Sequence, residues 1–559
     1  MEKSYSIIYQ GDIIKALEEN GINRYMILND QLAVIYVDEN FDENTLESIS
    51  EITWVQEAQP MSSLIQIQDG VENGETVTDA SGTDYIENSP YLSIAGEGSI
   101  IAIIDSGIDY MHPDFINEDN TSKIISIWDQ DGNTNLPPEG MIFGSEYTRQ
   151  DINNAISNND SSLTKDDIGT GTIAAGIASG GGALNPLYKG VAPKSELVVV
   201  KLKSYEGTYE NGKINYLNTD FLAAIKYVLD ISKRENKNTI INLTIAERSR
   251  SIILTNLLDT FPYLNSSGVI LVSGAGNEGN TNIHYEGTFS DDSSEPIDIT
   301  LEVGEQNSLD ITICPNGPGR LGVDIISPTG EVSYNVQYSP DEEVYKGKFN
   351  LENSPYLIKL TYPWILSGNE EIYIKIFNIR PGIGTIRVFP EFFAKGEFDL
   401  YLPNGNLIPN NTRFLDPNSY STITLYGATE NVITVGAFND KTNGMWIGSS
   451  KGPMKSNIVI KPDIVAPGVD IISPFINSTY IKSTGTGVSS SLTSGVLALI
   501  MEYISTLGTY QRKLLFTKVL KTYLMLGATK NPIYTYPNSS QGYGVLNLRD
   551  TIVAIANNI

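Results

Sequence analysis

Few side chains in this chain of 559 residues titrate near neutral pH. The sequence has two histidines, His112 and His284, and one cysteine, Cys314. A single cysteine excludes an internal disulfide and any metal cluster built from cysteines. General acid–base chemistry near pH 7 would therefore depend on where the two imidazoles stand relative to the acids and hydroxyls.

Short motifs rich in small residues follow one another along the chain. One apolar run ends in Asp105 and leads to a His112-Pro113-Asp114 turn. A small-residue loop around Thr170 enters a helix, and Asn277 lies in a glycine-rich turn. The motifs are Ile101-Ala-Ile-Ile-Asp-Ser-Gly-Ile-Asp109, Asp166 to Gly176, Gly190 to Leu197, Val272 to Gly279, Pro462 to Gly468 and Ser483-Thr-Gly-Thr-Gly-Val488.

The elements that carry these motifs alternate between buried strands and helices. We expect strands at 99–104, 196–202, 239–244, 268–273 and 431–437, and helices near 171–179, 220–233, 488–504 and 511–526. This alternation predicts an α/β fold, with a parallel sheet covered by helices on both faces. Asp105 then lies at the carboxyl end of a fully buried strand.

In this order the motifs resemble those of the subtilase family of serine proteases, over about 84–284 and 413–559. The resemblance implies that an Asp orients a His, that the His takes a proton from a Ser, and that an Asn amide helps hold the oxyanion. The Asp falls on Asp105 and the Asn on Asn277. An Asn after Gly also suits a tight turn, so Asn277 has a structural interpretation beside the functional one.

The other two positions depart from the family pattern. The motif Gly-His-Gly-Thr stands here as Gly169-Thr170-Gly171-Thr172, and Gly-Thr-Ser stands as Gly485-Thr486-Gly487. Threonine has no group that titrates near neutral pH, and glycine has no side chain. The resemblance therefore predicts a pseudoprotease, in which Asp105 remains while Thr170 and Gly487 replace the base and the nucleophile.

We considered whether other residues could substitute for the missing pair. Neither His112 nor His284 is expected to reach a nucleophile at the start of the helix near 488. The serines Ser489, Ser490 and Ser491 enter that helix one to two turns late and are predicted to be packing residues. An active serine endopeptidase with one of them as an unusual nucleophile is the alternative.

Two further units flank and interrupt the α/β region. Residues 1–68 have the β-α-β-β-α-β order of a ferredoxin-like unit, and 69–83 are expected to be a linker. Residues 288–412 show short alternating runs without a convincing helix, which predicts an antiparallel β-sandwich of jelly-roll type. The insertion divides the subtilase region into 84–287 and 413–559.

This arrangement resembles the clostridial Csp proteins, subtilases of the bacterial spore. The resemblance implies that an active member cuts a cortex-lytic proenzyme on germination and that inactive members regulate that step. The implied partners are a sister Csp protein, a germinant for which a bile salt is the candidate, and the chain's own propeptide, whose end at Met61–Gln68 would lie in the substrate cleft. It implies no cofactor, and a structural Ca²⁺ is compatible with the family although no ligand set can be named.

Composition excludes several other classes of protein. The net charge of −30 disfavours nucleic acid or an anionic membrane surface as a partner. The first residues, MEKSYSIIYQGD, lack the cationic start and long apolar run of a signal peptide. The apolar run Gly495–Met501 is far shorter than the roughly 20 residues that a membrane span needs. We therefore expect a protein that stays inside the producing cell, in the spore by resemblance. A structural or binding module of the spore is the remaining alternative.

Overall fold

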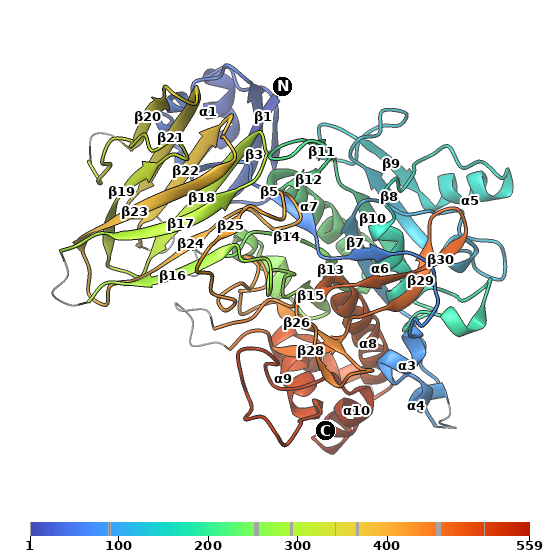
Figure 1. Cartoon of the computed structure of the whole chain (residues 1–559). Helices are drawn as coiled ribbons and strands as arrows, with labels where there is room; N and C mark the ends of the chain where they lie inside the picture. Colours follow the sequence, from blue (N-terminus) through green and yellow to red (C-terminus); the bar gives the residue numbers. More distant parts are fainter. Residues whose placement is uncertain are drawn as a thin grey trace.

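The computed structural model describes residues 2–87, 89, 91–250, 257–290, 294–340, 343–364, 368–453, 460–507 and 509–558. It has three parts: a small N-terminal domain, a body built on a parallel sheet, and a β-sandwich beside both (Figure 1). The predicted fold class, a subtilisin-like α/β body with a ferredoxin-like domain and an inserted β-sandwich, is confirmed.

The body is organised around a sheet that runs β27-β26-β15-β13-β7-β10-β8-β9, with β28 beside β26. Its central strands pair in parallel, and only β9 and β27 at the edges run antiparallel among the strands described. The bounds are β7 (Ser99–Asp105), β8 (Ile124–Asp129), β9 (Ser145–Thr148), β10 (Glu196–Lys201), β13 (Asn238–Leu243), β15 (Val269–Gly274), β26 (Ile433–Asn439), β27 (Gly444–Met445) and β28 (Ile464–Pro467).

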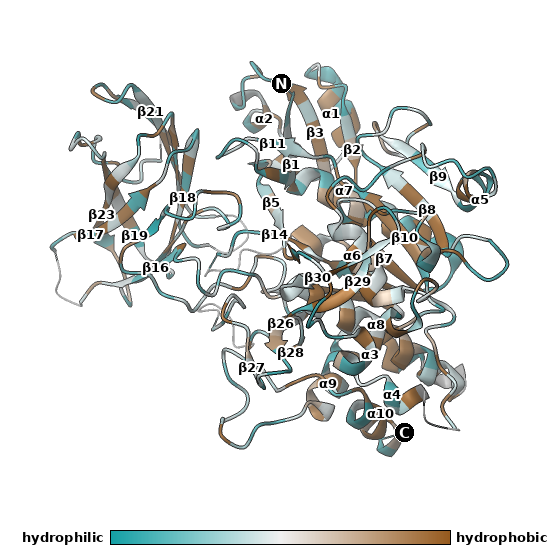
Figure 2. Cartoon of the chain, turned by 45° about the vertical axis from the view of Figure 1, so that its right-hand side comes forward, coloured by the Kyte–Doolittle hydropathy of each residue, from teal (hydrophilic) through white to brown (hydrophobic). Residues whose placement is uncertain are grey.

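Helices cover both faces of this sheet. Successive side chains of a strand point to opposite faces, so Ile101 and Ile103 of β7 pack with α6 and α8, whereas Ile100 and Ile104 pack with α7. Figure 2 shows the hydrophobic colour following the central strands. The body's helices are α5 (Arg149–Ser157), α6 (Thr170–Ser179), α7 (Asn218–Glu235), α8 (Thr486–Thr506), α9 (Thr517–Gly527) and α10 (Leu548–Asn557).

Helix α8 is long and apolar enough to cross a membrane by length and composition alone. However, 89% of its most apolar stretch is buried inside the protein. This is the environment of a core helix, and the small residues of α8 allow it to approach α6 and the sheet closely.

The N-terminal domain has the predicted order of elements. Its sheet runs β2-β3-β1-β4, and all its pairs are antiparallel. The second helix is short, with four residues. The bounds are β1 (Glu2–Tyr9), α1 (Ile13–Glu19), β2 (Tyr25–Ile27), β3 (Leu32–Asp38), α2 (Asn44–Glu47) and β4 (Ile52–Glu57).

The β-sandwich consists of a six-stranded and a four-stranded antiparallel sheet. It begins slightly before the expected residue 288, because His284 already pairs with Tyr401. The first sheet contains β16 (His284–Thr288), β24 (Glu397–Tyr401), β18 (Ser308–Pro315), β22 (Glu371–Phe377), β21 (Ser354–Thr361) and β20 (Val344–Phe349). The second contains β19 (Arg320–Ile326), β23 (Gly382–Phe392), β17 (Ile297–Val303) and β25 (Arg413–Phe414).

The segment expected to be a linker, 69–83, contains a short helix that packs on the body. Val77 is fully buried in the body core, and Glu75 forms a parallel bridge with Ile471. A period of 3.6 residues cannot be recognised in a helix this short, so no local pattern predicts it. The segment and its surroundings contain β5 (Pro60–Ser63), β6 (Gln66–Gln68), α3 (Val77–Ser81), α4 (Asp84–Glu87), β11 (Tyr205–Glu206), β12 (Ile214–Leu217), β14 (Ile245–Glu247), β29 (Ile471–Phe475) and β30 (Thr479–Thr484).

Candidate functional site

Asp105 lies at the carboxyl end of β7 and is fully buried. Its Oδ1 accepts hydrogen bonds from the Thr170 hydroxyl at 2.5 Å and from the Ser106 backbone N–H at 2.6 Å. The Thr244 hydroxyl, just after β13, donates to Oδ2. Burial raises the pKa of Asp105 to about 6, because the loss of water outweighs the stabilising hydrogen bonds from Thr170, Thr244 and Ser106.

Thr170 is the first residue of α6, and its hydroxyl fills the space beside the acid. Besides Asp105, it contacts the Ser106 hydroxyl at 2.9 Å. The preceding loop is fixed by the Asp166 carboxylate, which accepts from the Gly169 N–H at 2.7 Å. A Cβ on Gly171 would lie 2.0 Å from the Gly107 carbonyl oxygen. The backbones of α6 and the loop after β7 therefore touch, and Thr170 is held against Asp105 without any group that could act as a base.

Gly487 is the second residue of α8. Its N–H donates to the carbonyl oxygen of Leu64 at 3.0 Å. Beside it, Asn277 accepts from the Thr486 backbone N–H at 3.0 Å and from the Thr486 hydroxyl at 2.9 Å. The Asn277 amide is thus oriented by the start of α8, next to the position where the Leu64 carbonyl lies.

Residues 60–68, which we call the strap, run through the body between its cleft strands. Their first part, β5, pairs antiparallel with β12 on one side and with β14 on the other. The Leu64 N–H donates to the Thr244 carbonyl oxygen at 2.7 Å, and β6 then pairs with β30. The strap therefore binds as an added β-strand, the mode by which clefts hold extended peptides.

The peptide bond between Leu64 and Ile65 lies directly over Gly487. A Cβ built on Gly487 would be 2.8 Å from Ile65 Cγ1 and 3.0 Å from the Leu64 carbonyl carbon. The Leu64 side chain packs against Gly274, where a Cβ would approach its Cδ1 to 2.8 Å. The strap thus occupies the space that a side chain at 487 would need.

Other parts of the protein hold the strap in place. From the loop after β24, the Asn404 amide donates to the Ser62 hydroxyl at 2.9 Å, and the Asn406 amide donates to the Ser63 carbonyl at 3.1 Å. The N-terminal domain rests on the start of α7, where the Tyr36 hydroxyl donates to Asp220 at 2.7 Å. The strap is therefore bound by the body and the β-sandwich, and the domain that precedes it is anchored on α7.

The structure brings neither histidine to this site. The buried His112 ring accepts from the Asp114 N–H through Nδ1 at 3.2 Å and reaches the Thr479 carbonyl through Nε2 at 3.1 Å. His284 lies in the β-sandwich, where Nε2 is 2.8 Å from an Asp399 oxygen. Both rings are committed to structural contacts.

The serines of α8 are also used in packing. All three are fully buried. The Ser489 hydroxyl donates to the Ala466 carbonyl at 2.9 Å, Ser490 to Asn242 at 2.9 Å, and Ser491 to the Gly487 carbonyl at 2.7 Å. The prediction that they are packing residues agrees with these contacts.

No group of three or more His, Cys, Asp or Glu residues that could hold a metal ion occurs within the described part of the chain. The buried Cys314 is a free thiol in β18, and burial raises its pKa well above the ordinary range. Cys314 thus lies near Glu371 and Arg250 and contributes no reactive thiolate to the cleft.

The raised pKa of Asp105 predicts that the variant Asp105→Asn is more stable than the natural protein above pH 7. The folded-state pKa of about 6 exceeds the ordinary value of 3.8, so folded Asp105 binds its proton more tightly than the unfolded chain does. The free energy of unfolding is therefore highest below pH 4 and decreases as the pH rises through 6. The Asn side chain does not ionise, so at high pH the free energy of unfolding of Asp105→Asn should exceed that of the natural protein by on the order of 2–3 kcal/mol. Urea unfolding at pH 4 and pH 8 checks it, with Asp416→Asn at an exposed position as control. A gain equal at both pH values, or none at pH 8, would contradict the assignment.

A family model described as the subtilase family matches residues 96–344 and 403–544, more than half of the chain. The chain belongs to the subtilase family. The unmatched residues between the two ranges, 345–402, lie within the β-sandwich. The matched ranges contain Asp105, Thr170, Asn277 and Gly487.

Among solved structures, this subtilase is similar to the CspB protease of Clostridium perfringens, with 27% identity and a TM-score of 0.76 over 86% of this chain and 98% of that one. Among curated proteins, it is 23% identical to the C5a peptidase of Streptococcus pyogenes over 459 residues and 29% identical to a subtilisin of a Bacillus species over 194 residues. The chain spans only 37% of the length of each of these two relatives.

Several residues of this subtilase site were not predicted from the sequence. Thr244, which follows β13 and is 139 positions from Asp105 in the chain, contacts that acid, and Asn404 reaches the strap from the β-sandwich. Thr244 comes directly after the buried run Thr239–Leu243. Asp105 likewise stands at the end of a buried apolar run. A search for polar residues at the ends of all buried parallel strands would have found it.

Proposed function

We propose that the chain is a catalytically inactive subtilase, a pseudoprotease of the clostridial Csp type, that acts through binding. The observation that carries the proposal is the position of the Leu64–Ile65 peptide over Gly487, with its carbonyl oxygen bound by the Gly487 N–H. The peptide lies where a substrate bond would meet a nucleophile, and there is no side chain to attack it.

The base is missing in the same way. A serine nucleophile needs a group that takes its proton, and an acid that orients this group. Here Asp105 is bound by the hydroxyls of Thr170 and Thr244, which satisfies the carboxylate without an imidazole. Both losses support a role without turnover.

A protein that cannot cut its own chain keeps its N-terminal domain. We infer that residues 1 to about 68 remain attached and that the strap fills the cleft permanently. The contacts of β5 with β12 and β14, and those of Asn404 and Asn406, support this, since they bind the strap along its length. A filled cleft leaves the outer surfaces of the protein for partners.

The regulatory part of the proposal rests on the likeness to CspB and on the Csp resemblance of the sequence. We propose a CspC-like protein of the spore that relays a germinant signal, with a bile salt as the candidate, to a sister Csp protease that activates a cortex-lytic enzyme. The match along 98% of the CspB chain supports a shared architecture. CspB itself is described as a protease, so the absence of turnover here is argued from Thr170 and Gly487.

Spores that lack this protein test the proposal. We expect them to fail to process the cortex hydrolase after germinant addition. Both the natural protein and its Asp105→Asn variant should restore processing, because a binding role does not need the acid. Normal processing without the protein would contradict the regulatory role and would favour a structural module. Processing restored by the natural protein but not by folded Asp105→Asn would indicate an active protease.

A further inference from the structure

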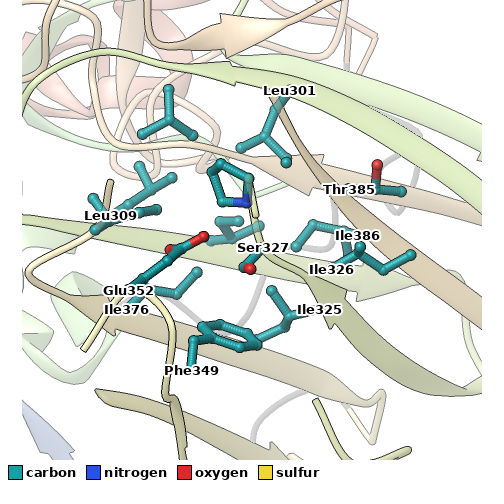
Figure 3. Close-up of a pocket in the computed structure, with 15 residues that line it drawn as sticks. Leu301, Leu309, Ile325, Ile326, Ser327, Phe349, Glu352, Ile376, Thr385 and Ile386 are labelled. Atoms are coloured by element: carbon teal, nitrogen blue, oxygen red, sulfur yellow. The ribbon is translucent and has the colours of Figure 1, made fainter. Parts of the chain in front are cut away.

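The interior of the β-sandwich has a small gap between its two sheets, lined by Leu301, Leu309 and Phe349 among others (Figure 3). Its cavity volume is about 20 Å³, which is room for about one water molecule. The gap is therefore a packing space within the core and not a ligand site. The stronger candidate in this domain is a pair of carboxylates, Glu370 and Glu391.

Glu370 and Glu391 lie where the start of β19 meets the end of β23. Glu370 directly precedes β22 and is 2% exposed. Its Oε2 accepts a hydrogen bond from the Leu321 N–H at 2.7 Å. The Oε1 atoms of both carboxylates are buried, and neither has a hydrogen-bond partner among the residues that the structure describes. Because buried oxygens are almost always paired, these two indicate a partner from outside the chain.

A β-bulge sets the direction of the Glu391 side chain. Leu321 pairs with Pro390 and Arg320 pairs with Phe392, so Glu391 is the extra residue of β23. Bulges of this kind re-aim a side chain out of the regular alternation of a strand. A Cβ on Gly322 would lie 3.5 Å from Glu391 Oε1 and 3.3 Å from the Val336 carbonyl oxygen. These two oxygens therefore face a common point, which the missing side chain of Gly322 leaves open.

The two carboxylates are close enough to influence each other. Loss of hydration raises the pKa of Glu370 to about 8; the Leu321 N–H and Arg320 oppose this rise, and the charge of Glu391 adds to it. Burial also raises the pKa of Glu391. Arg320 thus supplies one positive charge beside two acids. The electrostatics of this corner favour a further cation and disfavour an anion.

We propose that Glu370 and Glu391 bind one Ca²⁺ ion at the bulge of β23. The Val336 carbonyl oxygen is a third protein ligand, and water fills the remaining positions. Ca²⁺ takes about six to eight oxygen ligands in a flexible geometry, whereas Mg²⁺ demands a near-ideal octahedron. Two carboxylates and a main-chain oxygen at an irregular strand position suit Ca²⁺ better.

The ion joins three segments of the β-sandwich: the residue before β22, the bulge of β23, and the segment after β19 that carries Val336. None of these residues belongs to the cleft. The site is therefore independent of whether the cleft has turnover.

Terbium luminescence and calorimetry test the site on the full chain, freed of metal with EDTA. A buffer of about 150 mM KCl screens weak association of ions with exposed acids. Tb³⁺ replaces Ca²⁺ and emits when a nearby aromatic ring absorbs ultraviolet light. Tyr338 and Tyr362 can serve as these rings, because both stack on Arg320, at 5.7 and 5.6 Å from their ring centroids. We expect saturable emission that Ca²⁺ displaces and that Mg²⁺ at the same concentration does not.

The variants Glu370→Gln and Glu391→Gln each remove one negative charge and keep an oxygen acceptor. Each should bind one Ca²⁺ ion fewer per chain than the natural protein, because the affinity of this site decreases at least about tenfold. Glu305→Gln is the matched control. Glu305 is an exposed acid between β17 and β18 of the same domain, and its variant should bind as many ions as the natural protein.

Near-UV circular dichroism without added metal checks that each variant is folded. The proposal is overturned if the natural protein binds no Ca²⁺, which would leave a proton shared between the two carboxylates as the explanation of the buried pair. It is also overturned if folded Glu370→Gln and Glu391→Gln bind as many ions as the natural protein, or if Glu305→Gln loses a site as they do.

Discussion

A variant that carries both Thr170→His and Gly487→Ser should remain a single uncut chain of 559 residues, as should the natural protein. A Cβ at 487 would already be 3.0 Å from the Leu64 carbonyl carbon and 2.8 Å from Ile65 Cγ1. These distances are shorter than ordinary van der Waals contact, so a serine would displace the strap before its hydroxyl could attack. Intact mass spectrometry of both proteins measures the outcome.

The expected difference from an active enzyme is large. Removing the serine or the histidine of subtilisin, a member of this family, costs about 10⁶ in turnover. A fluorophosphonate should therefore label neither the natural protein nor the double variant. The triple variant with Ile65→Ala, which removes the closest contact, is the matched control for crowding. A fragment that ends at Leu64 in the double variant would show that the cleft still has a working geometry.

The variant Arg250→Ala should lose about 3–5 kcal/mol of stability, the cost of leaving a buried charge without its partner. Arg250 follows β14 and is 3% exposed. Its guanidinium bonds Glu371 of β22 at 3.0 Å and contacts Glu247 of β14 at 3.3 Å. Without it, both carboxylates stay buried between the body and the β-sandwich. Urea unfolding followed by tryptophan fluorescence checks the loss.

Two controls separate this effect from a general loss of charge. Arg234→Ala removes a surface partner of Glu235, whose pair is half exposed, and should change stability by less than about 1 kcal/mol. Arg250→Lys keeps the charge but cannot reach two carboxylates in the same geometry, so its loss should be intermediate. A loss below about 1 kcal/mol in Arg250→Ala would show that the ionic contact does not hold the two parts together.

The same contact connects the β-sandwich with the cleft. Glu247 belongs to β14, and β14 pairs with the strap at Met61. Arg248, two residues before Arg250, lies 3.4 Å from Asp310 of β18 in the same buried interface. A change in the position of the β-sandwich would therefore act on the strand that holds the strap, as would a change at Asn404.

Local patterns in the sequence were sufficient for the fold class and for most elements of the body. Buried strands such as β7 appear as unbroken apolar runs, and α7 has the periodicity of a helix with one face on the core. Elements without such patterns were missed. The helix α3 within the expected linker at 69–83 was missed because it is only five residues long and is stabilised by burial of Val77 in the body.

The sequence alone determined that the chain has the motifs of a subtilase, and that Thr170 and Gly487 stand at two of the positions that matter. Both conclusions need only residue types in a local order. The tertiary structure alone decided that Thr244 shares Asp105 with Thr170, and that the Leu64–Ile65 bond lies over Gly487. These contacts join segments separated by 139 and by more than 400 positions. They arise because parallel strands bring their carboxyl ends to one edge and the strap completes that edge as a further strand, which no local pattern encodes.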